Sequence, residues 1–190
     1  PPQGRADYAF FQHILKSMDP KTGRCAILFP HGVLFRGEEY EMRKKLVESD
    51  LVECVIGIGK NLFFNSPMEA CIVICRSKKP TEHRGKILFI NAKDEVTRKN
   101  AESYLEEKHI QKIANTYLNF EEIDGFSAVA DIKTIQGYDN KLSISRYVSN
   151  VTDEEINSVE DNIADWVQTV SDLSESTDKL MKLLLRWQSG

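Results

Sequence analysis

Hydrophobic and polar positions along the chain predict helices and buried strands in turn. Apolar residues recur at helical spacing over residues 7–18, and Pro20 and Gly23 end that pattern. Residues 36–50 have acids in their first turn and bases further on, which favours a helix because these charges complement the helix dipole. Short continuous apolar runs predict buried strands at residues 24–30, 51–58, 69–77 and 87–90. The order strand, helix, strand predicts an α/β fold with a mainly parallel sheet.

The third predicted strand departs from this parallel pattern. It follows the second strand after about ten residues and no helix, which is short for a crossover between parallel strands. We therefore expect an antiparallel hairpin there. After Asn91 we expect a polar, partly helical segment and then a helix over residues 105–120, whereas residues 126–148 show only short-range patterns.

Residues 151–190 carry the most regular pattern in the chain. Apolar residues follow heptad spacing with one polar interruption at Thr177, and Thr152 and Glu155 form a capping-box sequence at the start. We predict one long helix over residues 152–187, set apart from a front domain at 1–150. A small α/β domain cannot cover so long an apolar stripe, so the helix should dock on another chain. The predicted docking residues are Ile163, Trp166, Val170, Leu173, Leu180 and Leu184.

Composition limits the class of protein. The 190 residues are 28% charged and 41% hydrophobic, which is typical of a soluble globular protein with one sizeable core. No apolar run approaches the ~18 residues of a membrane span, and the polar start has no signal peptide. The start also lacks Met, so we expect an upstream part to be missing. Residues 1–150 carry a net charge near +2 and the tail −6, a balance that does not indicate nucleic-acid binding by itself.

The four cysteines predict packing rather than metal binding. Cys25, Cys54, Cys71 and Cys75 all lie in strand-like runs, without a CxxC pair or a histidine at zinc spacing. We expect them to be reduced and buried, in a cytoplasmic protein without a metal site.

Two sequences that resemble nucleotide or cofactor motifs lack the residues that those motifs need. The segment "GIGKN" at 57–61 lacks the spacing of a phosphate-binding loop, and no clear helix follows it. The opening "PPQG" lacks both the Asn and the aromatic residue of the Asn-Pro-Pro-aromatic motif of amino-group methyltransferases.

Three other positions carry functional alternatives. His31 follows a predicted strand, where ligand sites of α/β sheets collect, but it can equally be a plain loop residue. Arg36 can contact a phosphate or pair with a nearby acid. Phe63 and Phe64 stand side by side in the predicted hairpin loop. One of them can fill the core beneath the loop, or their rings can stack on a base drawn out of a nucleic acid.

A set of segments in order resembles the modification subunits of type I restriction–modification systems, which are adenine-N6 DNA methyltransferases. The segments are "GRADYAFFQHILKSM", "GRCAILFPHGVLFRG", "LVECVIGIGKNLFFNSPMEACIVICRSKK", "GKILFINAKD", "EEKHIQKIANTY" and "DNKLSISRYV". The resemblance covers about residues 1–150, and the tail is similar only in being a long predicted helix.

The resemblance implies a Rossmann-like methyltransferase sheet that ends in an antiparallel hairpin. It also implies that the Gly-rich loop for S-adenosylmethionine and the catalytic Asn-Pro-Pro-Phe motif lie upstream of Pro1. The chain then matches the C-terminal part of the methyltransferase domain, holds no catalytic residue and is inactive alone.

For the site, the resemblance implies that Phe63 stacks on the extruded adenine. The neighbouring target-base residues would be Asn61 and Phe64, and DNA contacts would come from Arg36, Lys60 and His31. A Leu-Pro pair usually precedes this segment in the family, whereas Ile58, Gly59 and Lys60 stand here.

The implied partners are DNA, a specificity subunit that chooses the sequence, and a restriction subunit. The heptad tail would dock on the specificity subunit or, without it, on a second copy of the chain. The alternative is a non-catalytic interaction module with a degenerate α/β domain and a coiled-coil tail. A hydrolase is less well supported, since the chain has neither a G-x-S-x-G elbow nor an H-E-x-x-H pair.

Overall fold

The computed structural model describes residues 5–63, 66–99, 102–148, 167 and 177. The chain divides into two units, Pro1–Asn150 and Val151–Gly190, and the fold below is that of the first. Of the predicted tail helix, Val167 and Thr177 are described and both are helical. The rest of that helix, with all six predicted docking residues, lies outside the described residues.

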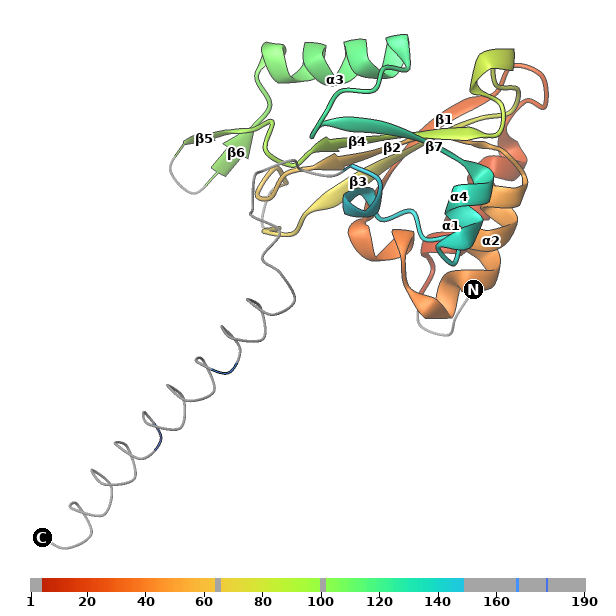
Figure 1. Cartoon of the computed structure of the whole chain (residues 1–190), viewed down its shortest axis with the longest axis horizontal. Helices are drawn as coiled ribbons and strands as arrows, with labels where there is room; N and C mark the ends of the chain where they lie inside the picture. The colour runs from red at the N-terminus through yellow and green to blue at the C-terminus, as the bar shows by residue number, and fades with distance from the viewer. Residues whose placement is uncertain (1–4, 64–65, 100–101, 149–166, 168–176, 178–190) are drawn as a thin grey trace, which may run out of the picture. The chain divides into compact units, whose positions relative to one another are not determined.

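A five-stranded sheet forms the centre of the first unit (Figure 1). Its strands, in spatial order, are β1 (Arg24–Pro30), β3 (Ala70–Arg76), β2 (Val52–Ile58), β4 (Lys86–Ala92) and β7 (Ser127–Asp131). β3 is antiparallel to both β1 and β2, which confirms the predicted hairpin. The expectation of a mainly parallel sheet is wrong. Among the described strands, only β2 and β4 are parallel neighbours, because β3 folds back between β1 and β2 and β7 adds antiparallel to β4.

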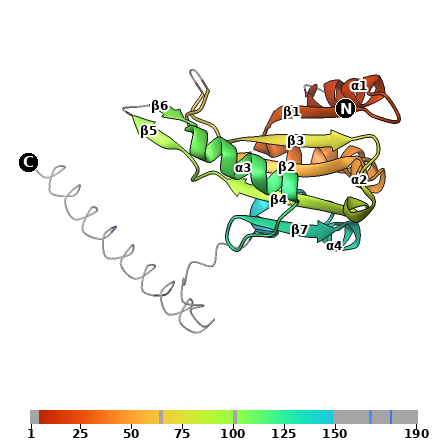
Figure 2. The same cartoon turned by 90° about the horizontal axis from the view of Figure 1, so that it is seen from above.

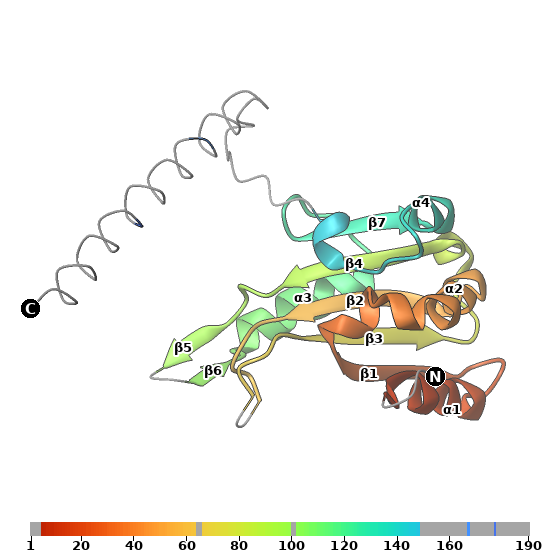
Figure 3. The ribbon, with the colours of Figure 1, turned by 90° about the horizontal axis from the view of Figure 1, so that it is seen from below.

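Helices cover the two faces of the sheet unequally (Figures 2 and 3). One face carries α1 (Asp7–Ser17), α2 (Tyr40–Glu48) and α4 (Ile132–Gly137), and the other carries α3 (Glu107–Asn119). Every residue of β2 is buried, which explains its continuous apolar run. Over β1, by contrast, Ala26 and Leu28 on the α3 side remain exposed.

Short elements shape the ends of the strands. The 3₁₀ turn η1 (His31–Leu34) follows β1, η2 (Gly37–Glu39) precedes α2, η3 (Thr81–His83) precedes β4, and η4 (Ile144–Arg146) closes the first unit's described part. The partly helical segment expected after Asn91 is instead a separate hairpin of β5 (Thr97–Lys99) and β6 (Glu102–Tyr104). These strands are three residues long and mostly polar, so no apolar alternation marks them in the sequence.

The cysteines form no disulfide: Cys54, Cys71 and Cys75 are buried and Cys25 is half-buried. The part of the chain that the structure describes contains no helix of sufficient length and hydrophobicity to cross a membrane. It also contains no cluster of three or more His, Cys, Asp or Glu that could hold a metal ion.

Candidate functional site

The loop that carries Phe63 begins with a close passage of two backbones. A Cβ on Gly59 would lie 2.6 Å from the carbonyl oxygen of Lys93 and 2.8 Å from Cγ1 of Val96, so glycine lets the loop leave β2 against the segment that follows β4. Asn61 then adopts a left-handed backbone with φ 58°, a conformation that asparagine tolerates better than most residues. These two residues set the path of the loop as it leaves β2.

Phe63 stands at the turn of this loop. It forms an antiparallel bridge with Ser66, whose N–H donates to the Phe63 carbonyl over 3.1 Å. The tip between them, at 64–65, lies outside the described residues, and the role expected for Phe64 stays a prediction. Phe63 is 37% exposed, so its ring does not fill the core beneath the loop.

The β5–β6 hairpin braces the loop from the side. The backbone N–H of Ser103 on β6 donates to the Asn61 carbonyl over 3.0 Å. Figure 3 shows the hairpin projecting beyond the end of the sheet beside the β2–β3 connection. The loop is therefore held at Gly59, at Asn61 and through its own bridge.

Loop, hairpin and sheet together enclose an apolar groove with a cavity volume of about 550 Å³. Aromatic walls come from Phe63 and Tyr104, and Ser103 also lines the groove, although its hydroxyl oxygen is buried. The remaining lining residues are aliphatic: Ala26, Leu28, Ile58, Leu62, Ile72 and Leu105. This volume is within the range of small-molecule sites, and flat aromatic faces suit a planar ring. Sequence reasoning missed Tyr104, although an aromatic residue in the polar stretch "ESYLEE" was a usable signal.

Lys60 stands at the base of the loop and is exposed. Its ammonium lies 3.6 Å from Glu69 Oε1 across the loop. Exposed ion pairs of this kind contribute little and exchange readily, so the ammonium can turn to another anion.

His31 lies at a second, more polar cavity of about 230 Å³ at the carboxyl ends of β1, β2 and β4. Gly57, Glu69, Asn91, Lys93, Ser143 and Ser145 are among its lining residues. The Nε2 atom of His31 is buried and has no hydrogen-bond partner among the residues that the structure describes. Gly57 lines this cavity and Ile58 lines the groove, because successive residues of a strand face opposite sides of a sheet. His31 and Phe63 therefore belong to different faces of one sheet end.

Of the two alternatives for Arg36, a phosphate contact or an ion pair with a nearby acid, the structure shows the ion pair. Its NH1 atom lies 3.1 Å from Asp7 Oδ2 and 3.8 Å from Glu39 Oε1. Glu39 is fully buried, and burial raises the pKa of its carboxyl. Because the guanidinium ties the start of α1 to the start of α2, a contact with phosphate would require that link to open.

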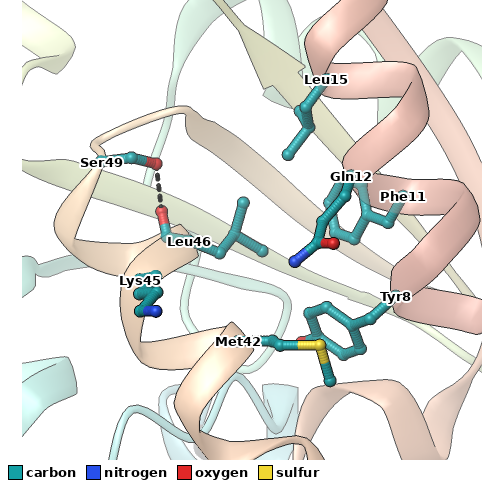
Figure 4. A pocket seen from close by; sticks show the side chains of 8 residues that line it. All are labelled: Tyr8, Phe11, Gln12, Leu15, Met42, Lys45, Leu46 and Ser49. Carbon is teal, nitrogen blue, oxygen red and sulfur yellow. Dashed lines mark hydrogen bonds between the residues drawn. The ribbon is translucent and has the colours of Figure 1, made fainter. Parts of the chain in front are cut away.

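A third cavity, of about 170 Å³, lies between α1 and α2 (Figure 4). Its walls are mostly apolar, and its polar side chains are Gln12, Lys45 and Ser49 with the Tyr8 hydroxyl. Ser49 donates to the Leu46 carbonyl over 2.7 Å and Tyr8 to the Val33 carbonyl over 3.2 Å. The Ser49 hydroxyl bonds within the end of α2 and the Tyr8 hydroxyl joins α1 to η1, so the cavity presents no group of residues suited to catalysis.

Comparisons with known proteins agree with one another. The family model described as N-6 DNA Methylase matches residues 1–156. The MjaVIII methylase subunit of a type I restriction enzyme from Methanocaldococcus jannaschii is 39% identical over 160 residues, which are 82% of this chain and 27% of that protein. The HindI methylase subunit from Haemophilus influenzae is 32% identical over 170 residues, 82% of this chain and 36% of that protein.

A solved structure shows the same relationship. The methyltransferase subunit of a type I restriction–modification system from Streptococcus thermophilus superposes with a TM-score of 0.73 at 36% identity, over 78% of this chain and 31% of that one. The chain thus spans about a third or less of the length of these relatives. The family match over most of the chain, together with these relatives, shows that the chain belongs to the N-6 DNA methylase family.

Proposed function

We propose that the chain is the C-terminal part of a subunit that methylates adenine N6 in DNA, of the type I restriction–modification kind. The observation that carries the proposal is Phe63, a part-exposed aromatic ring on a braced loop beside an apolar groove. An enzyme that modifies adenine in a duplex turns the base out of the stack, and an aromatic face offsets part of the lost stacking. Phe63 provides this face, and Asn61 and Phe64 complete the base-binding loop.

The groove beside Phe63 does not suit S-adenosylmethionine itself. Its lining is mostly apolar and includes no charged side chain that could pair with the ammonium and carboxylate groups of that cofactor. We assign cofactor binding, and the groups that orient the amine of adenine, to a part of the subunit outside this chain. On this account, the chain holds the target base and supplies none of the transferring groups.

The proposed DNA contacts are phosphate contacts that position the duplex. Lys60 stands exposed at the base of the loop, and His31 and Lys93 line the cavity on the other face of the same sheet end. The ammonium groups of Lys60 and Lys93 would neutralise phosphates next to the extruded base without reading sequence. Arg36 is not part of this proposal because Asp7 already engages it.

The proposed partners are a specificity subunit, which chooses the DNA sequence, and a restriction subunit. Residues 1–150 would complete the methyltransferase domain, and the heptad stripe of 151–190 would dock on the specificity subunit. DNA modification of this kind places the complex in the cytoplasm.

The competing function is a non-catalytic interaction module. The coding sequence upstream of Pro1 discriminates between the two. A Gly-rich loop and an Asn-Pro-Pro-Phe motif there are expected for the enzyme, and their absence would favour the module.

The activity is tested with the intact subunit, purified with its specificity subunit. Unmethylated genomic DNA is incubated with S-adenosylmethionine carrying a labelled methyl group and is then digested to nucleosides. We expect the label in N6-methyldeoxyadenosine. Label in a methylcytosine, or no transfer by a complex that binds both DNA and cofactor, would overturn the proposal.

The 190-residue chain alone serves as the companion sample. Calorimetric titration with S-adenosylmethionine should give no binding at micromolar cofactor. Micromolar affinity would place the cofactor site within this chain and contradict our division of roles.

A further inference from the structure

Two of the four cysteines face each other across neighbouring strands of the sheet. Cys25 on β1 pairs directly with Cys75 on the antiparallel strand β3, and β1 is the edge strand beside it (Figure 3). The Ser77 N–H donates to the Gly23 carbonyl over 2.9 Å. Hydrogen-bonded pairs alternate along an antiparallel ladder, so Cys25 and Cys75 form the next such pair. Their side chains lie on one face of the sheet and join the same hydrophobic cluster.

This position suits a disulfide bond. The Cα atoms of a hydrogen-bonded antiparallel pair lie about 5.5 Å apart. Cysteines in disulfides have Cα separations of roughly 4.4–6.8 Å, so the strands already have the required spacing. The Cys75 thiol also donates a hydrogen bond to the Cys25 sulfur. Linking the two sulfurs therefore requires rotation of side chains and no movement of strands.

The two thiols differ in access and in acidity. Cys25 is half-buried, whereas Cys75 is 0% exposed. The hydrogen bond from Cys75 lowers the pKa of the Cys25 thiol to about 7, and the same bond together with burial raises the pKa of Cys75. An accessible thiol that ionises near neutral pH is the kind that reacts with oxidants. Cys25 is thus placed to react first, and Cys75 to react with the product.

The other two cysteines have neither feature. Cys54 and Cys71 are fully buried, and burial raises the pKa of each thiol. Neither has a cysteine opposite it on a neighbouring strand of the described sheet. They therefore serve as matched controls within the same chain.

We propose that Cys25 and Cys75 are a peroxide-sensitive pair that closes to a disulfide between β1 and β3. The Cys25 thiolate attacks one oxygen of hydrogen peroxide. The S–O bond forms, the O–O bond breaks, and the leaving hydroxide takes up a proton and departs as water. The Cys75 sulfur then attacks the sulfur of the sulfenic acid. The S–S bond forms, the S–O bond breaks, and the second hydroxide leaves as water with the proton of the Cys75 thiol.

In total, the two thiols lose two electrons and two protons, and one peroxide is reduced to two waters. The new bond would close a loop of about fifty residues that contains β2 and Phe63, and such a link stabilises a fold by restricting the unfolded chain. The pair faces away from the groove, because Ala26 lines the groove and successive residues of a strand face opposite sides. The inference does not rest on the proposed function.

Peptide mapping of the 190-residue chain tests the pairing. The reduced chain, freed of reductant, is treated with hydrogen peroxide at neutral pH, its remaining thiols are alkylated, and its peptides are analysed by mass spectrometry without reduction. We expect the peptide of Cys25 linked to that of Cys75, and dithiothreitol should separate them. Sulfinic acid on Cys25 with Cys75 still a free thiol would overturn the proposal. So would a chain that stays fully reduced at a peroxide dose that oxidises glutathione.

Variants test the order of the two steps. Cys75→Ala should stop the reaction at the sulfenic acid of Cys25, which dimedone captures. Cys25→Ser, a small change at a half-buried position, should leave Cys75 reduced. Cys54→Ala and Cys71→Ala should keep the wild-type link. Oxidation of Cys75 at the wild-type rate in Cys25→Ser would contradict the assignment of Cys25 as the residue that reacts first.

The same treatment in concentrated urea separates a preformed pair from chance encounters. The unfolded chain should give mixed pairings of all four cysteines, and the folded chain only the link between Cys25 and Cys75. One mixture from both samples would overturn the proposal. The oxidised folded chain should also melt several degrees above the reduced chain. An equal rise in peroxide-treated Cys25→Ser would assign that stabilisation to another modification and contradict the link.

Discussion

The hydroxyl of Tyr117 on α3 donates a 2.7 Å hydrogen bond to Oε2 of Glu53, which is 1% exposed at the start of β2. Arg76 NH1 lies 3.2 Å and His83 Nδ1 3.5 Å from the other carboxylate oxygen. A charge can be buried at this depth only with such partners. The network joins α3, β3 and η3 to β2 at the end of the strand opposite to the groove, so it supports the scaffold rather than the site.

Tyr117→Phe should destabilise the protein by about 1–3 kcal/mol, because the change removes a hydrogen bond to a buried carboxylate and keeps the ring. The free energy of unfolding of the 190-residue chain, from urea denaturation, measures the effect. Tyr138→Phe removes a hydroxyl from an exposed tyrosine and should cost less than about 0.5 kcal/mol. Equal effects for the two variants would mean that the Glu53 bond does not hold α3 in place.

The same network predicts a dependence on acid. Burial acts to raise the pKa of Glu53, but hydrogen bonds from Tyr117, Arg76 and His83 outweigh it, so the pKa lies below its ordinary value. A carboxyl with a depressed folded pKa stabilises the protein above its unfolded pKa, near 4.3, and loses that contribution as pH falls through the folded pKa.

The difference in unfolding free energy between wild type and Glu53→Gln should therefore be largest at neutral pH. It should shrink progressively below about pH 4. Glu82→Gln, a change at an exposed acid, should show no such trend. A difference that grows on acidification would show that the pKa of Glu53 is raised in the folded protein rather than lowered.

Alanine substitutions at three glycines test how closely the backbone is packed beside the Phe63 groove and the His31 cavity. Gly59→Ala drives a Cβ to 2.6 Å from a backbone carbonyl that cannot move aside, and we expect a loss of about 1–3 kcal/mol. Gly57→Ala brings a Cβ to 2.8 Å from the terminal methyl of Ile144, which can shift, and to ordinary contact at 3.6 Å with the His31 ring, so it should cost less. Gly37→Ala has no heavy atom within 4 Å and should stay within about 0.5 kcal/mol of wild type. Thermal and urea unfolding rank the three, and a neutral Gly59→Ala would show that the loop path is not fixed there.

The heptad stripe predicts association. Exposing it would cost several kcal/mol at about 25 cal/mol per Å² of apolar surface, so without a specificity subunit the chain should be at least partly dimeric. Leu173→Asp combined with Leu180→Asp should make it monomeric and leave the α/β unit folded. Sedimentation equilibrium at micromolar concentration measures both forms. A strictly monomeric wild type would remove the main physical support for partner docking through this stripe.

The sequence predicted what depends on local apolar runs. The run in β2 is continuous because every residue of that strand is buried, and the short link to β3 leaves room only for a hairpin. The sequence did not predict β7, because "SAVAD" is short and consists mostly of small residues. It did not predict β5 and β6 either, because these strands are mostly polar.

For the site, the sequence indicated the aromatic loop but not its surroundings. Asn61 and Ser103 are joined by a backbone bond between segments about forty residues apart, and no side-chain pattern records such a bond. Tyr104, which follows Ser103, lines the groove beside that bond. In the sequence, Glu53 is a charged residue within an apolar strand. Its contacts with Tyr117 and His83, which come from distant segments, are visible only in the structure.

The central claim is that Phe63 holds the extruded base. Photocrosslinking tests it most directly, once sequencing of methylated DNA has given the target site. A duplex with 5-iodouracil in place of the target adenine is bound by the intact subunit with its specificity subunit, irradiated, and mapped by mass spectrometry of the crosslinked peptide. Our account predicts a crosslink to the peptide that contains Phe63, lost in Phe63→Ala. A crosslink confined to residues outside the groove, unchanged in Phe63→Ala, would contradict it.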